Sequence, residues 1–159
     1  MKKSLVLIAG IAAAIAFAGV CRAQIDPFMG TWKLNEAKST FAPGVPRNDT
    51  VVYEAAGDKV KVTVDSTDTD GRSTHNEWTG NFDGKDYPVI GDSTSDACSY
   101  KKISDRMLQF TLKKSGKVTV IGRIVVSADG KSRIVTTSEA GAEAGSFKIT
   151  RDRLVYNKQ

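Results

Sequence analysis

Pairs of turn-forming residues recur at short intervals through most of the chain. Asp-Gly and related pairs tolerate the positive φ angles that tight hairpin turns require. No segment between them shows a helical period. The pairs are Gly57-Asp58, Asp70-Gly71, Asp83-Gly84, Ser104-Asp105, Ser115-Gly116 and Asp129-Gly130. Their spacing predicts a chain of β-hairpins.

Apolar and polar residues alternate in the runs between these turns. Valine occupies every second position of residues 60–64, and large apolar residues do so in residues 108–112. In residues 118–126 apolar residues keep every second position on both sides of Gly122. A period of two with one apolar face is typical of half-buried antiparallel strands.

The pattern predicts an all-β fold, an antiparallel up-and-down (meander) β-barrel of about 8–10 strands. A sandwich is the alternative, but closure leaves no unprotected edge strand. Residues 35–48 contain two prolines and a glycine, which predicts a long loop with at most one helical turn. The expected strands are residues 28–34, 50–56, 59–66, 73–82, 86–90, 96–103, 106–113, 117–127, 131–139 and 146–156.

The first 23 residues have the pattern of a secretory signal peptide. Lys2 and Lys3 precede an uncharged apolar run, and Ala23 provides a small residue for cleavage. The run is shorter than the roughly 20 residues that span a bilayer. We expect a signal peptide at 1–23, a β-barrel domain at 24–159, and a periplasmic or secreted protein without a membrane span. Lipoprotein anchoring at Cys21 is the alternative, although Val20 is a poor residue before an acylated cysteine.

The net charge of +5 comes largely from this leader. Without Lys2, Lys3 and Arg22 the chain has 20 basic and 18 acidic residues. A net charge of +2 with no cluster of Lys and Arg does not favour nucleic acid as a partner.

Few residues suit catalysis or metal binding. Cys98 has no disulfide partner after cleavage, and we expect it to be buried as a small apolar residue. His75 alternates with Trp78 and Phe82, which predicts that it faces outward beside Glu77. A single outward histidine leaves no catalytic triad, zinc site or axial haem ligand. We expect no enzyme activity, no metal and no cofactor.

One segment matches part of a calcium-binding loop. Aligned to such a loop, Asp68, Asp70, Gly71 and Glu77 take ligand or turn positions, but Ser66 replaces the first acid. Asp and Gly are also common at the polar tips of hairpins, because they adopt the backbone conformations that turns require. A plain turn is therefore the preferred interpretation.

The two ends of the mature chain resemble known barrel families. Residues 26–34 (DPFMGTWKL) resemble the opening of lipocalins and fatty-acid-binding proteins, where Gly-x-Trp lies on the first strand. Residues 153–158 (RLVYNK) resemble the last strand of fatty-acid-binding proteins, and the middle is similar to small exported lipocalin-like domains of bacteria. This resemblance implies a calycin barrel in which Trp32 closes one end above Gly30.

The chain also departs from those families. Residues 35–48 are too short and proline-rich for the helical lid of fatty-acid-binding proteins. In that family an Arg and a Tyr two positions apart on the last strand bind a carboxylate. Here Arg153 and Tyr156 are three apart, which places them on opposite faces unless a bulge intervenes.

The apolar face predicts what the barrel interior contains. Its members are Trp32, Leu34, Val60, Val62, Val64, Trp78, Phe82, Leu108, Phe110, Leu112, Val118, Val120, Ile124 and Val126. If the barrel is hollow, we expect a monomeric binding protein for a small hydrophobic molecule, lipid-like or aromatic. If it is packed, the alternative is a protein-interaction or inhibitor module. The expected ligand-binding residues are Trp32, Tyr53, Val62, Trp78, Phe82, Tyr100, Leu108, Phe110, Val120, Ile124 and Arg153.

Overall fold

A computed structural model describes residues 26–41, 47–140 and 147–159. The expected signal peptide, its cleavage site and Cys21 lie outside these residues. Among the residues described, no helix has the length and apolar character needed to cross a membrane.

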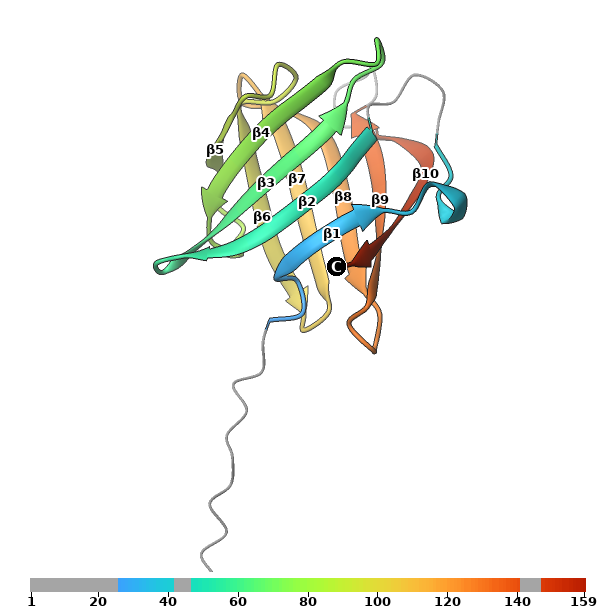
Figure 1. Cartoon of the computed structure of the whole chain (residues 1–159). Helices are drawn as coiled ribbons and strands as arrows, with labels where there is room; N and C mark the ends of the chain where they lie inside the picture. Colours follow the sequence, from blue (N-terminus) through green and yellow to red (C-terminus); the bar gives the residue numbers. More distant parts are fainter. Residues whose placement is uncertain (1–25, 42–46, 141–146) are drawn as a thin grey trace, which may run out of the picture.

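Ten antiparallel strands form one closed barrel (Figure 1). Each strand pairs with its neighbours in sequence, and β1 pairs with β10 to close the barrel. The all-β up-and-down fold is therefore confirmed. The strands are β1 (Gly30–Leu34), β2 (Arg47–Ala56), β3 (Lys59–Thr67), β4 (Ser73–Gly80), β5 (Tyr87–Ile90), β6 (Ala97–Ser104), β7 (Met107–Lys114), β8 (Lys117–Val126), β9 (Ser132–Ala140) and β10 (Phe147–Lys158).

Each predicted strand is present, with shifts at its ends. The largest shift is in β2, which begins at Arg47 rather than at residue 50. A short 3-10 helix (Glu36–Lys38) follows β1, and the Asn35 side chain accepts a hydrogen bond from the Lys38 N–H at its start. This helix is the single helical turn expected in the loop.

The hairpin between β7 and β8 shows how the turn pairs act. Ser115 and Gly116 have φ values of 50° and 75°. Two successive positive φ angles make the kind of two-residue turn whose twist matches that of paired strands. The Ser115 N–H also donates to the Asp96 carboxylate at 2.7 Å, which fixes the turn against the preceding loop.

One end of the barrel is closed by aromatic side chains. Trp32 and Phe28 are fully buried, and the Trp32 indole N–H donates to the Phe28 carbonyl oxygen at 2.8 Å. Gly30 has a φ of 103°, and the aliphatic part of the Lys158 side chain lies where a Cβ would point. The strand therefore begins on a glycine because the chain must turn tightly beneath Trp32.

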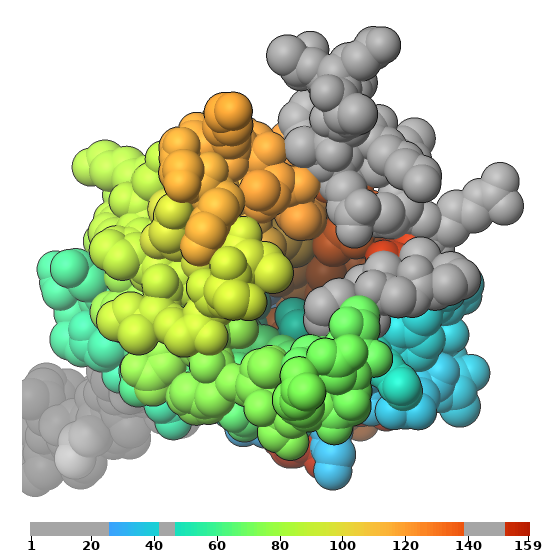
Figure 2. All heavy atoms as spheres, turned by 90° about the horizontal axis from the view of Figure 1, so that it is seen from above, coloured from blue at the N-terminus to red at the C-terminus, as the bar shows by residue number. Residues whose placement is uncertain are grey.

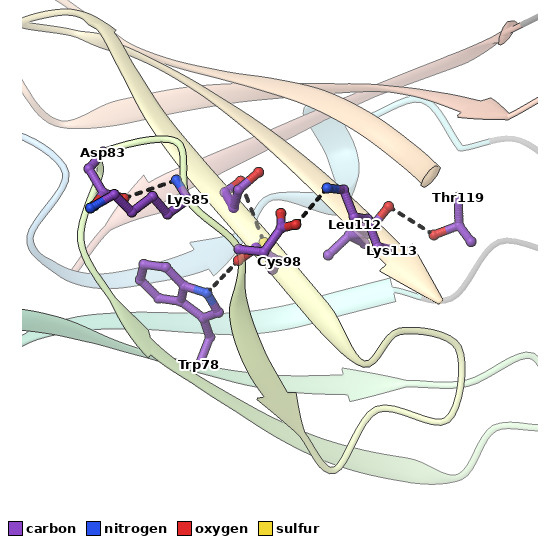
Figure 3. Close-up of polar contacts among 9 residues, drawn as sticks. Trp78, Asp83, Lys85, Cys98, Leu112, Lys113 and Thr119 are labelled. Atoms are coloured by element: carbon purple, nitrogen blue, oxygen red, sulfur yellow. Dashed lines mark hydrogen bonds and ion pairs between the residues drawn. The ribbon is translucent and has the colours of Figure 1, made fainter. Parts of the chain in front are cut away.

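Strand β5 is the shortest in the barrel. It pairs over two residues with β4 and over two with β6, and Pro88 is one of its paired residues. Proline has no N–H to donate to a ladder. Trp78 of β4 compensates on the inner side, because its indole N–H donates to the carbonyl oxygen of Cys98 of β6 at 2.9 Å (Figure 3).

Candidate ligand-binding cavity

The barrel encloses a cavity of about 780 Å³. It is lined at one end by Asp68 and Asp92, from the β3–β4 and β5–β6 connections, and by Lys117, the first residue of β8, whereas the closing Trp32 and Phe28 at the other end do not line it. Figure 2, viewed from this end, shows the molecule hollowed between the described loops. The barrel is therefore hollow, with a mouth at the end opposite Trp32.

The middle of the cavity has apolar walls. The inward side chains that line it come from β2 to β10, because every second residue of a strand points inside. They include Val51, Val62, Val64, Leu112, Val120 and Leu154. Such walls suit a ligand body without polar atoms.

The mouth, by contrast, is polar. Thr74 and Asn76 share the inward parity of Trp78 on β4 and line the cavity above it. Asp68, Asp92 and Lys117 add both signs of charge around the mouth. Water reaches this end, so polar inward residues remain solvated there.

Aromatic rings surround the deep part of the cavity. The ring centroid of Tyr100 lies 4.8 Å from that of Trp78, 6.0 Å from that of Phe110 and 6.3 Å from that of Tyr53. The pKa of Tyr100 is raised well above its usual value. Burial is the largest cause, and the nearby Tyr53 is the next. The Tyr100 hydroxyl is therefore neutral at any physiological pH.

An arginine also lies inside the barrel, on β9. Arg133 is 2% exposed and lines the cavity, and its Cζ lies 4.8 Å from the ring centroid of Trp32, 5.1 Å from that of Tyr53 and 4.8 Å from that of Tyr156. Its Nε and Nη1 atoms are buried without a hydrogen-bond partner. From β10, the buried Asp152 lines the same cavity and has an interaction partner of its own.

Sequence reasoning missed Arg133 because β9 has no clear apolar face. Ile134 and Val135 are adjacent, so alternation alone does not show which one points inward. The strand register shows that Val135 is the inward residue, because it pairs with the inward Ile124 of β8 and the inward Leu154 of β10. Arg133, two residues before Val135, therefore points inward as well.

The expected ligand-binding residues fall into three places. Trp32, Phe82 and Leu108 pack in the core beyond the cavity, and Arg153 is exposed outside the barrel. The members that line the cavity are Tyr53, Val62, Trp78, Tyr100, Phe110, Val120 and Ile124.

Arg153 requires a correction. Its guanidinium Nη1 lies 3.4 Å from the Lys38 carbonyl oxygen, whereas the buried Tyr156 points inward and donates its hydroxyl to the Asn48 carbonyl oxygen at 2.9 Å. Although β10 is irregular between Ile149 and Arg153, the two side chains lie on opposite faces. Arg153 therefore does not orient a ligand inside this cavity.

The remaining candidate residues are His75, which lies apart from the cavity, and Cys98, whose thiol stays protonated at neutral pH. His75 is 57% exposed, with Nδ1 2.7 Å from Asp65 Oδ1 and Nε2 3.6 Å from Glu77 Oε1. Hydrogen bonding to Asp65 is the largest cause that raises the His75 pKa. Cys98 is 2% exposed and lines the cavity, and burial raises its pKa to about 12.

The calcium-like segment forms an ordinary turn. The Asp68 carboxylate accepts backbone hydrogen bonds from Asp70 and Arg72, and Arg72 pairs with Asp70 at 2.9 Å. Glu77 pairs instead with Lys61 at 2.6 Å on the outer face. Within the described part of the chain no group of His, Cys, Asp and Glu side chains is arranged to hold a metal ion.

Comparison of the chain with protein-family models, with curated proteins and with solved structures gives no significant match. The closed antiparallel barrel is compatible with a calycin-like fold. The barrel geometry thus carries the functional argument.

Proposed function

We propose that this protein is an exported carrier or scavenger that binds one small, largely apolar molecule inside its barrel. The cavity of about 780 Å³ with apolar walls is the observation that carries the proposal. Pockets for small molecules usually measure about 300–1,000 Å³ and combine apolar walls with a few polar groups.

Apolar burial would supply most of the affinity. A ligand that loses about 300 Å² of apolar surface to the walls gains about 7 kcal/mol, at roughly 25 cal/mol per Å². The cost of ordering the ligand reduces this gain. Micromolar affinity is therefore the expected upper limit for this gain alone.

The cavity chemistry favours binding over catalysis. Cys98 is a nucleophile in principle, but a thiol whose pKa is about 12 is protonated at neutral pH. His75 lies on the outer face and does not reach it. We therefore propose no enzymatic role.

Export is proposed from the leader-like first 23 residues, which would place the carrier in the periplasm or outside the cell as a monomer.

A second candidate, a protein-interaction module, is favoured by exposed Ile103 and Val125, which are 49% and 39% exposed on β6 and β8. The two candidates differ in whether the barrel is occupied.

Native mass spectrometry of protein purified from its own host tests the proposal. A carrier is expected to show a discrete additional mass that is lost under denaturing conditions. A bare chain that binds no apolar dye after purification, and that retains a protein partner in pull-downs, would support the interaction module instead.

A further inference from the structure

Asn76 of β4 places a neutral amide among apolar side chains inside the barrel. It pairs with Val64 of β3, which pairs with Val51 of β2, and all three line the cavity. Asn76 is half-buried, and its side-chain amide has no hydrogen-bond partner among the described residues. Its nitrogen and oxygen are not among the fully buried atoms that lack a partner, so both are open to the cavity.

A second polar group of this kind lies in the β5–β6 connection. Ser95 is 2% exposed and lines the cavity, and in the described part of the chain its hydroxyl forms no hydrogen bond. The connection packs on β4 at Asn76, because a Cβ added to Gly91 would lie 3.3 Å from the Asn76 Cα. Two neighbouring segments therefore present an amide and a buried hydroxyl to the same cavity.

Other polar side chains around the upper cavity are satisfied in other ways. The Ser66 hydroxyl donates to the Asn48 side-chain oxygen at 2.9 Å. Thr74 shares the inward face of β4 but is exposed at the mouth, where water solvates it. Asn76 and Ser95 lie deeper, so a ligand in the cavity displaces the water that could solvate them.

This displacement determines which ligand group fits. A ligand group that replaces water without reproducing its hydrogen bonds loses affinity. Amide and hydroxyl groups are neutral and can both donate and accept, which matches a hydroxyl or a carbonyl oxygen. A carboxylate fits less well, because neither group offsets its charge and Asp92 lies in the same connection as Ser95.

We propose that the ligand is a neutral hydrophobic alcohol or ketone whose oxygen atom hydrogen-bonds to Asn76 and Ser95. This inference rests on the proposed carrier function. Trp78 lies two residues deeper than Asn76, about 7 Å along β4. A bicyclic hydrocarbon spans this distance, and its rings pack on Trp78, Tyr100 and Phe110 below the oxygen.

Competition of tetralin derivatives for bound N-phenyl-1-naphthylamine, a neutral dye, tests the proposal on the mature protein at pH 7.5. The probes are tetralin, 2-tetralol and tetralin-2-carboxylate, which share one bicyclic body. A cavity without a polar partner binds 2-tetralol about tenfold more weakly than tetralin, because the hydroxyl loses its water. The parent is instead expected to bind 2-tetralol at least as tightly as tetralin, and the carboxylate at least tenfold more weakly than 2-tetralol.

Asn76→Leu keeps the size of the side chain and removes its amide. It is expected to weaken 2-tetralol binding at least tenfold and to leave tetralin affinity equal or higher. Ser95→Ala is expected to weaken 2-tetralol binding at least threefold. Thr74→Val is the matched control on the same face of β4, and both affinities are expected to stay within twofold.

A measurement on the parent alone guards against a variant that does not fold. The NMR signals of the Asn76 side-chain amide protons are expected to shift further downfield with 2-tetralol than with tetralin. Tighter binding of tetralin or of the carboxylate than of 2-tetralol, equal amide shifts, or equal effects of Asn76→Leu and Thr74→Val would overturn the polar site and leave the carrier function standing. A parent that binds neither the probes nor the dye would overturn both.

Discussion

The Trp78 indole N–H donates to the carbonyl oxygen of Cys98 at 2.9 Å, although β5 lies between their two strands. Both residues are buried and line the cavity. Since β5 pairs over only two residues on each side, this bond ties β4 to β6 where the ladder is weakest.

Trp78→Phe is expected to lower the free energy of unfolding by about 1–3 kcal/mol, because it leaves the Cys98 carbonyl buried without this donor. Urea denaturation measures the change. Thr119→Val is the control, since the half-buried Thr119 hydroxyl donates to the Leu112 carbonyl at 3.2 Å and its loss is expected to cost less. Equal losses in the two variants would show that the Trp78 bond has no special role.

Trp32→Ala is expected to destabilise the fold by about 3–5 kcal/mol, because it empties the closed end of the barrel. His75→Ala is the comparison, because that side chain is 57% exposed, and its denaturation midpoint is expected to stay close to that of the parent. Similar midpoints for the two variants would contradict the assignment of strand faces.

His75 is expected to titrate above its usual pKa of 6.5, chiefly because its ring hydrogen-bonds to Asp65. A raised pKa in the folded state means that the charged pair stabilises the fold below pH 6.5 and that this contribution is lost as pH rises through the raised pKa. NMR titration of the imidazole measures it. Asp65→Asn should lower the pKa more than Glu77→Gln, and the reverse order would contradict the geometry.

The Cys98 thiol is expected to resist alkylation in the folded protein at pH 8, because it is 2% exposed and its pKa is raised to about 12. In urea it should react as an ordinary thiol. Iodoacetamide labelling followed by mass spectrometry of mature protein measures both rates. Rapid labelling without denaturant would mean that the cavity admits reagents to a reactive thiolate.

The strands could be predicted because most of them have one clearly apolar face between recognisable turns. Gly122 occupies an inward position of β8, and the sequence of that strand does not explain why a glycine stands there. In the structure the Phe110 ring occupies the space where a Cβ of Gly122 would lie. Facing strands thus determine such a residue, and a single strand does not reveal it.

The polar part of the candidate site could not be predicted in this way. Thr74 and Asn76 point inward with Trp78. They are not among the expected ligand-binding residues, because the sequence pattern predicts an apolar interior. Arg133 required the register of β9 against its two neighbours. These residues depend on where water and facing strands lie, which alternation in one strand does not encode.

Fluorescence titration of the mature protein with N-phenyl-1-naphthylamine tests the central claim, that the barrel holds a small apolar ligand. Phe110 lines the cavity, whereas its neighbour Thr111 does not. The parent is expected to bind one dye molecule, and Phe110→Trp should weaken binding at least tenfold with little change in melting temperature. Thr111→Trp should leave binding unchanged. A parent that binds no dye, together with a Phe110→Trp variant destabilised by about 1–3 kcal/mol through overpacking, would contradict the carrier function.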